Sequence, residues 1–169
     1  LFVLVIVSTF FFAWAQTQLD ALKASTSKLI SNDAIDLSLL ITDNFNLDTI
    51  FEPMEMYARA DLLIMQKKYR GAVLTLDTIL TTWPGHALED EILIVKGDLA
   101  ILYGDIESAL KFYSEVAELH FDDITGDDAL FKLAEIYDYE LNDLVKAEGL
   151  YERIIFEYCD LIGLGRPLV

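Results

Sequence analysis

The chain has few of the residues that disulfides, tight turns and β-rich folds require. It contains one cysteine, Cys159, so no disulfide can form within the chain. This cysteine lies in the apolar stretch IIFEYCDLI, where we expect a buried side chain rather than a nucleophile. The 169 residues include only three prolines and eight glycines, whereas Leu, Ala, Ile, Asp and Glu are abundant. This composition favours helices over a sandwich of short strands.

Basic residues are also scarce. Lys and Arg together number 12 against 29 Asp and Glu, which gives a formal net charge of −17. Such a surface repels the phosphates of nucleic acids and anionic lipid headgroups, so neither is an expected partner. The acidity instead suits a basic protein segment or a cationic ligand, or it serves solubility alone.

No sequence motif of a catalytic or cofactor site is present. The chain has no glycine-rich phosphate loop, no C-x2-C pair, no H-E-x-x-H and no G-x-S-x-G. His86 and His120 fall on separate loop segments, and the aspartates of HFDDITGDD lack the order of a calcium loop. In that loop Thr125-x-x-Asp128 predicts a helix capping box. We therefore expect no enzyme activity, no metal and no cofactor.

The first fifteen residues, LFVLVIVSTFFFAWA, form an uncharged apolar run. The run has about the length of the apolar core of a signal peptide, and Ala13-Trp14-Ala15 before Gln16 fits the small-x-small cleavage pattern. A membrane-spanning helix needs about 20 apolar residues, so an N-terminal anchor is the alternative. The first interpretation predicts an exported protein, periplasmic or extracellular after cleavage, and the second predicts a membrane tether through residues 1–15.

A repeat with a period near 37 residues covers about residues 53–157. Small residues recur on a first helix and alanines recur on a second helix, and we expect one inserted residue in the turn at 141–143, where insertion costs little. The first set is Ala60, Gly97 and Ala134, spaced by 37 and 37, and the second set is Ala72, Ala109 and Ala147, spaced by 37 and 38.

The segment GDLAILYGDIESALKFY, residues 97–113, displays one complete unit. Gly97 allows a neighbouring helix to approach closely, because it carries no side chain. Gly104 ends the first helix and Asp105 caps the next. Ala109 and Tyr113 then share one face of the second helix. The unit is therefore predicted to be a helical hairpin.

The spacing of Gly97, Gly104, Ala109 and Tyr113 resembles the tetratricopeptide repeat family, and the match covers about residues 53–157. The period is longer than the usual 34 residues, the first helices lack Trp, and Phe121 stands where the second unit would close with Pro. The resemblance implies an all-α fold, a right-handed α-α superhelix of about three such hairpins behind a degenerate N-terminal hairpin. The expected division is 1–15 signal peptide or membrane segment, 16–50 N-terminal hairpin, 51–84, 87–121 and 125–158 repeats, and 159–169 the irregular end of a truncated array.

An acidic residue follows the small residue of each first helix, at Asp61, Asp98 and Glu135. The resemblance implies that first helices line a concave groove and that this position faces it. Together with neighbours one turn away, the acids would make an apolar groove with a negative seam. The alternative is that these acids only belong to an acidic surface. The neighbours are Tyr57, Ile94 and Phe131 before the acids, and Ile64, Ile101 and Asp138 after them.

A groove of this kind suits a basic or amphipathic protein segment. The sequence therefore predicts a non-catalytic protein–protein interaction scaffold. The alternative is a structural subunit of an envelope or membrane complex, packed against its own partner domain with no free ligand. A small-molecule or carbohydrate-binding protein would need an aromatic platform, for which Tyr57, Phe131 and Tyr139 are the candidates. The sequence does not predict an oligomeric state.

Overall fold

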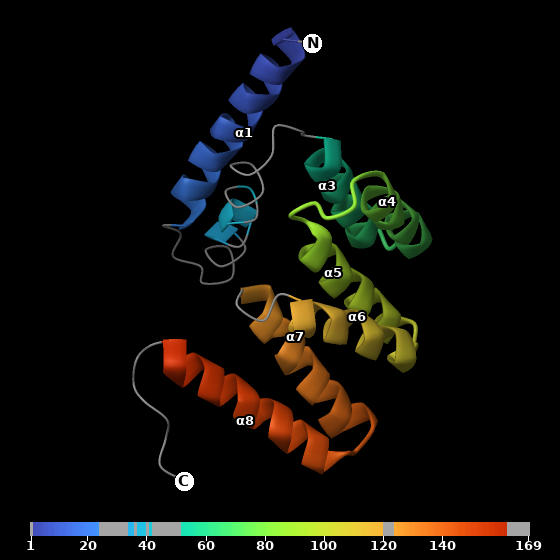
Figure 1. Ribbon diagram of the computed structural model, residues 1–169. Helices are drawn as coiled ribbons and strands as arrows, with labels where there is room; N and C mark the ends of the chain where they lie inside the picture. The colour runs from blue at the N-terminus through green and yellow to red at the C-terminus, as the bar shows by residue number, and fades with distance from the viewer. Residues whose placement is uncertain are drawn as a thin grey trace. The chain divides into compact units, whose positions relative to one another are not determined.

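The computed structural model describes residues 2–23, 34–35, 37–39, 41, 52–119 and 124–161 (Figure 1). These residues are helical apart from short turns, and they include no strand. The all-α prediction is therefore confirmed. The chain divides into two compact units, Leu1–Ala58 and Arg59–Val169.

In the first unit, α1 runs from Phe2 to Lys23 without a break at the predicted cleavage point between Ala15 and Gln16. Leu19 on α1 packs with Ala34 and Ile41, which lie in a short helical stretch. The Gln16 Nε2 group also donates a hydrogen bond to Ser38 Oγ in that stretch. Within the described residues, no helix combines the length and the apolar character that a membrane crossing requires. Residues 24–33, 36, 40 and 42–50 of the predicted N-terminal hairpin lie outside the described residues.

The second unit begins within α3 and continues as a series of helices, and α4 contacts α5. From α5 onward every helix contacts its successor, and α5 also contacts α7 (Figure 1). The first helices of the second and third hairpins are thus adjacent, as in a solenoid of stacked repeats. The bounds are α3 Glu52–Met65, α4 Tyr69–Thr82, α5 Glu89–Leu102, α6 Ile106–Leu119, α7 Ile124–Glu135, the π-helix η1 Ile136–Glu140 and α8 Leu144–Leu161.

The core of the second and third hairpins is continuous. It joins buried side chains of α5, α6, α7 and η1, and Leu150 and Ile154 of α8 pack against it. Because each hairpin buries its apolar face against the next, the burial stabilises the stack rather than any single hairpin. The buried members are Leu93, Ala100, Ala109, Tyr113, Val116, Ala117, Ala129, Leu130, Leu133 and Ile136.

The crossing of α5 and α6 requires a glycine. A Cβ atom placed on Gly97 would lie 2.3 Å from Cε1 of Tyr113, a distance at which atoms overlap. Tyr113 is only 2% exposed, so its ring has little room to move aside. The predicted role of Gly97 in close helix approach is confirmed.

The turn between the two helices of each hairpin has one repeated geometry. The second residue after the last helical residue has a positive φ: 58° at Lys67, 74° at Gly104 and 52° at Asn142. In the second turn, Ser108 N–H donates a hydrogen bond to Asp105 Oδ1 at 3.1 Å, which confirms the predicted cap. Lys68 at the matching position of the first turn makes no side-chain cap.

The extra residue of the third unit is not in the turn at 141–143, where we expected it. It is taken up by η1, where Leu141 N–H donates to the carbonyl oxygen of Ile136, five residues earlier. A π-turn holds one residue more than an α-turn, so it accommodates an insertion without breaking the helix. The small residue Ala134 and the turn residue Asn142 therefore keep their places in the repeat.

Two further expectations require correction. Helix α7 already begins at Ile124, so Thr125 lies in its first turn, and its hydroxyl donates a hydrogen bond to Asp90 Oδ2 at 2.7 Å instead of capping. Helix α8 continues to Leu161, so residues 159–161 are helical rather than irregular. The side chain of Cys159, together with His120, Phe121 and residues 162–169, lies outside the described residues.

Candidate interaction site

A hollow of about 280 Å³ opens between α5, α6, α7 and η1, and we call it the acidic hollow. It lies entirely within the second unit. Its walls combine carboxylates with isoleucine and tyrosine side chains. The lining residues are Asp98 and Ile101 of α5, Tyr113 of α6, Lys132 and Glu135 of α7, and Ile136, Tyr139 and Glu140 of η1.

Three of the predicted groove residues meet in this hollow: Asp98, Ile101 and Glu135. They come from two neighbouring first helices, α5 and α7, which contact each other. The expectation that acids of successive first helices share one concave surface therefore describes the second and third units. The two acids lie close together because the two hairpins stack, which brings positions 37 residues apart side by side.

The other predicted groove residues do not line the hollow. In α3, Asp61 is exposed and Ile64 is half-buried. Ile94 packs against the hydrophobic core. The Phe131 ring lies 6.0 Å from the ring of Tyr151 on α8, measured between centroids.

The remaining two predicted groove residues are Tyr57 and Asp138. Tyr57 belongs to the first unit, and Asp138 is half-buried in η1 without lining the hollow. The aromatic platform of Tyr57, Phe131 and Tyr139 is not assembled within the second unit, because only Tyr139 lines the hollow.

The carboxylate of Asp98 is already engaged by two neighbours. Its Oδ1 atom accepts a hydrogen bond from the Tyr113 hydroxyl at 2.7 Å and one from Lys132 Nζ at 2.6 Å. Lys132 Nζ also lies 5.7 Å from the centre of the Tyr113 ring. Burial, followed by the hydrogen bond to Asp98, raises the pKa of Tyr113 far above its usual value, so the phenol remains a donor.

Lys132 lines the hollow and pairs with Asp98, but the sequence pattern did not reveal it. The matching positions of the first two units hold Ala58 and Val95, so no basic residue recurs at this register. A search for repeated features therefore finds the acids and passes over their single cationic partner. The predicted negative seam is interrupted at Asp98, where the ion pair with Lys132 offsets the charge.

The π-helix η1 supplies the other side of the hollow. Tyr139 and Glu140 both line it, and the Tyr139 side chain is 74% exposed. Within the part of the chain that the structure describes, neither Glu135 nor Glu140 forms an ion pair with a basic side chain. Three carboxylates and one ammonium group leave the lining with a formal charge of −2. The hollow therefore attracts a cationic group and offers apolar contacts beside it.

The third hairpin is the part of the chain for which a family relationship is found. Residues 128–158 match the family model of the tetratricopeptide repeat. The match extends from the first turns of α7 into α8, and it confirms the resemblance inferred from the repeat spacing. No significant match was found among curated proteins or among solved structures.

Tetratricopeptide repeats generally mediate protein–protein interactions and are typically non-catalytic. In the described part of this chain, no group of three or more His, Cys, Asp or Glu side chains is placed to hold a metal ion.

Proposed function

We propose that this chain is a non-catalytic protein-interaction scaffold, and that the acidic hollow binds a basic or amphipathic segment of a partner protein. The tetratricopeptide repeat at residues 128–158 supports the scaffold role, because such repeats serve protein–protein contacts. One observation carries the chemistry of the partner: the hollow combines a formal charge of −2 with isoleucine and tyrosine walls.

A single arginine or lysine side chain of the partner would be complementary to each part of the lining. Its cationic group would pair with the carboxylates of Glu135 and Glu140, and its methylene stem would lie on Ile101 and Ile136. The exposed ring of Tyr139 would add a cation–π contact. Asp98 would contribute less to binding the cationic group, because it already forms an ion pair with Lys132.

A displayed peptide library tests this proposal. Peptides of about 12 residues are selected on the immobilised full chain, and the binders are measured against a Glu135→Gln/Glu140→Gln variant. We expect Arg and Lys to be enriched and the affinity for the variant to fall about tenfold, which is about 1.4 kcal/mol. Binding should also weaken between about 50 and about 150 mM salt, because screening shortens the reach of the carboxylates.

Asp61→Asn provides the matched control. Asp61 occupies the same register as Asp98 and is exposed, but it does not line the hollow, so its neutralisation should leave the affinity unchanged. Equal binding to the wild type and to the Glu135→Gln/Glu140→Gln variant would contradict the proposal. Failure to enrich any basic peptide would favour a structural role in which the stack packs permanently against a partner domain.

We further propose that residues 1–15 direct the protein out of the cytoplasm, either as a cleaved signal or as an anchor that keeps it on a membrane. The uncharged apolar run and the Ala13-Trp14-Ala15 pattern support this proposal. The intact mass of the protein isolated from its cells tests it. A chain that begins at Gln16 supports cleavage, and an uncleaved chain in the membrane fraction supports the anchor. An uncleaved chain in the cytoplasmic fraction would contradict both.

A further inference from the structure

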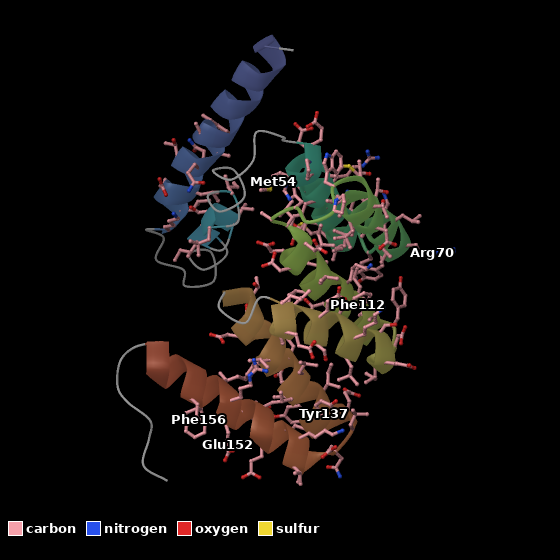
Figure 2. The ribbon with its side chains drawn as sticks, viewed as in Figure 1. Met54, Arg70, Phe112, Tyr137, Glu152 and Phe156 are labelled. Atoms are coloured by element: carbon pink, nitrogen blue, oxygen red, sulfur yellow. The ribbon has the colours of Figure 1, made fainter. Side chains whose placement is uncertain are left out.

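A second hollow, of about 330 Å³, opens between α6, α7 and α8, and we call it the Gly149 hollow. The continuous segment of α7 and η1 lines the two hollows with different faces, because successive helical residues are turned by about 100°. Leu133 and Tyr137 line the Gly149 hollow, whereas Lys132 and Ile136 line the acidic hollow. Figure 2 shows Tyr137 of η1 beside α8, while Glu152 and Phe156 project from α8 away from α7. The lining residues are Ser114, Ala117, Glu118, Leu130, Leu133, Tyr137, Lys146, Gly149, Leu150 and Arg153.

The glycine in this hollow is not required by the described chain. Gly149 lies within α8, where glycine is a poor helix former. A Cβ atom placed on it would meet nothing within 4 Å, and its φ is not among the positive values found in the turns. Gly97 differs, because the ring of Tyr113 fills the space beside it. Departures from helix preference without an internal reason are expected at functional or strained positions, and the open space at Gly149 leaves room for an external group.

The polar groups of the hollow have a charge opposite to that of the chain. The lining contains two basic residues, Lys146 and Arg153, and one acidic residue, Glu118. Its formal charge is therefore +1, whereas the net charge of the protein is −17. Lys146 Nζ lies 4.8 Å from the centre of the Tyr137 ring and 3.4 Å from Asp143 Oδ2, both near the hollow. An acidic group on a ligand would therefore compete with Asp143 for Lys146 at the surface, and it would meet Arg153 beside an apolar floor.

The floor and the walls define the shape of the ligand. Leu130, Leu133 and Leu150 provide apolar surface, and small residues of α6 and α8 line the sides. Small residues allow the backbone of an incoming helix to approach closely. The volume is sufficient for one large side chain, such as Leu or Phe, inserted from that helix.

We propose that the Gly149 hollow is a second docking site, which receives a helical segment of a partner protein. The segment inserts one large apolar side chain and carries Asp or Glu about one turn away, where it meets Lys146 or Arg153. A second copy of this chain is a poor occupant, because two molecules of charge −17 repel each other. This proposal does not depend on the function of the acidic hollow.

Selection from a displayed library of helical peptides of about 16 residues tests the proposal. One helical face is randomised, the full chain is the target, and binders are measured against Gly149→Phe. We expect binders with a large apolar residue and an acid one turn apart, and a loss of about tenfold or more in Gly149→Phe. The variant should fold, because the site has open space for the new side chain. Its thermal melting curve verifies this.

Ile155→Phe is the matched control, since it adds a phenyl ring to an exposed position of α8 outside the hollow. Its affinity for the peptides should equal that of the wild type. Replacing the peptide's acid with Lys should weaken binding to the wild type, and a Lys146→Glu/Arg153→Glu variant should restore it.

Three results would overturn the proposal. Equal affinity for the wild type and Gly149→Phe would place the peptides elsewhere. Binders that are basic and are lost in Glu135→Gln/Glu140→Gln would belong to the acidic hollow. Self-association in sedimentation that disappears in Gly149→Phe would assign the hollow to a second copy of the chain.

Discussion

The first and second hairpins share one register but fill their helix crossings with different residue pairs. The second hairpin combines Gly97 with Tyr113, and the first places Ala60 and Leu76 at the matching positions. All four positions are buried. The larger side chain accompanies the smaller residue, as expected where the packed volume at a crossing is fixed.

This difference in packing determines what each hairpin offers on its surface. The hydroxyl of Tyr113 reaches Asp98, which also pairs with Lys132 of the next hairpin. Leu76 has no hydroxyl, and Asp61 remains exposed. A core residue thus connects the interior of the second hairpin with the acidic hollow, and the first hairpin lacks that connection.

Replacing the Gly97–Tyr113 pair of the second hairpin should have the largest effect on the free energy of unfolding. Gly97→Ala places a Cβ atom against the Tyr113 ring and should lower the free energy of unfolding by about 2–3 kcal/mol. Adding Tyr113→Leu recreates the pair of the first hairpin and relieves the overlap. Urea unfolding should show that the double variant loses at least about 1 kcal/mol less than the sum of the single variants. Additive losses would mean that Gly97 and Tyr113 do not constrain each other.

The turns of the two hairpins differ as well, and the first can be improved. Lys67 has a positive φ and Lys68 provides no cap, whereas Gly104 and Asp105 fill both roles in the second turn. Lys67→Gly and Lys68→Asp should each stabilise the fold by about 1 kcal/mol in urea unfolding. Lys111→Asp, which changes the same charge within α6, should give no gain. If the Lys111→Asp control gained as much stability, the effect would be due to the change in charge alone.

The same glycine substitution should have opposite signs at two sites. Gly97→Ala destabilises, but Gly149→Ala should raise the free energy of unfolding by about 0.5–1 kcal/mol, because it improves the helix and has open space. Thermal or urea unfolding distinguishes the two variants. A loss of stability in Gly149→Ala would show that this glycine serves the fold, which would remove a premise of the second docking site.

The smallest expected effect is a pH dependence of the caps. Hydrogen bonds from Ser108 to Asp105 lower the pKa of Asp105. A lowered pKa in the folded state gives stability that is present above the unfolded value, about 3.9, and is lost as the pH falls through the folded value. The advantage of the wild type over Asp105→Asn should therefore be larger at about pH 7 than at about pH 3. An advantage that does not change with pH would show that the ionisation of Asp105 contributes no stability.

Much of the fold was predictable because its signals are local or recur at a fixed spacing. Gly97, Gly104 and Asp105 each act within one hairpin, and their residue types indicate their roles directly. The three acids were found by recurrence, and two of them, Asp98 and Glu135, line the acidic hollow. The sequence thus indicated the surface but not all of its partners.

Some of the features that the sequence did not predict depend on contacts between hairpins. Another, the π-turn, is a backbone geometry that no particular residue type indicates. Lys132 reaches Asp98 in the preceding hairpin, and Thr125 reaches Asp90 there as well. Neither contact has a counterpart in the other units. The extra residue of the third unit could be absorbed anywhere between Ala134 and Ala147, and the spacing alone does not distinguish a π-turn from a longer loop.

The central claim is that the acidic hollow binds a basic segment, and an NMR titration tests it most directly. The full chain, labelled at its isoleucine methyl groups, is titrated with an amphipathic peptide of about 12 residues that has Arg at about every fourth position. We predict saturable shifts of Ile101 and Ile136, which line the hollow, with Ile64 and Ile79 unchanged. These shifts should disappear in Glu135→Gln/Glu140→Gln. Unshifted Ile101 and Ile136 signals, or shifts that persist in that variant, would contradict the account.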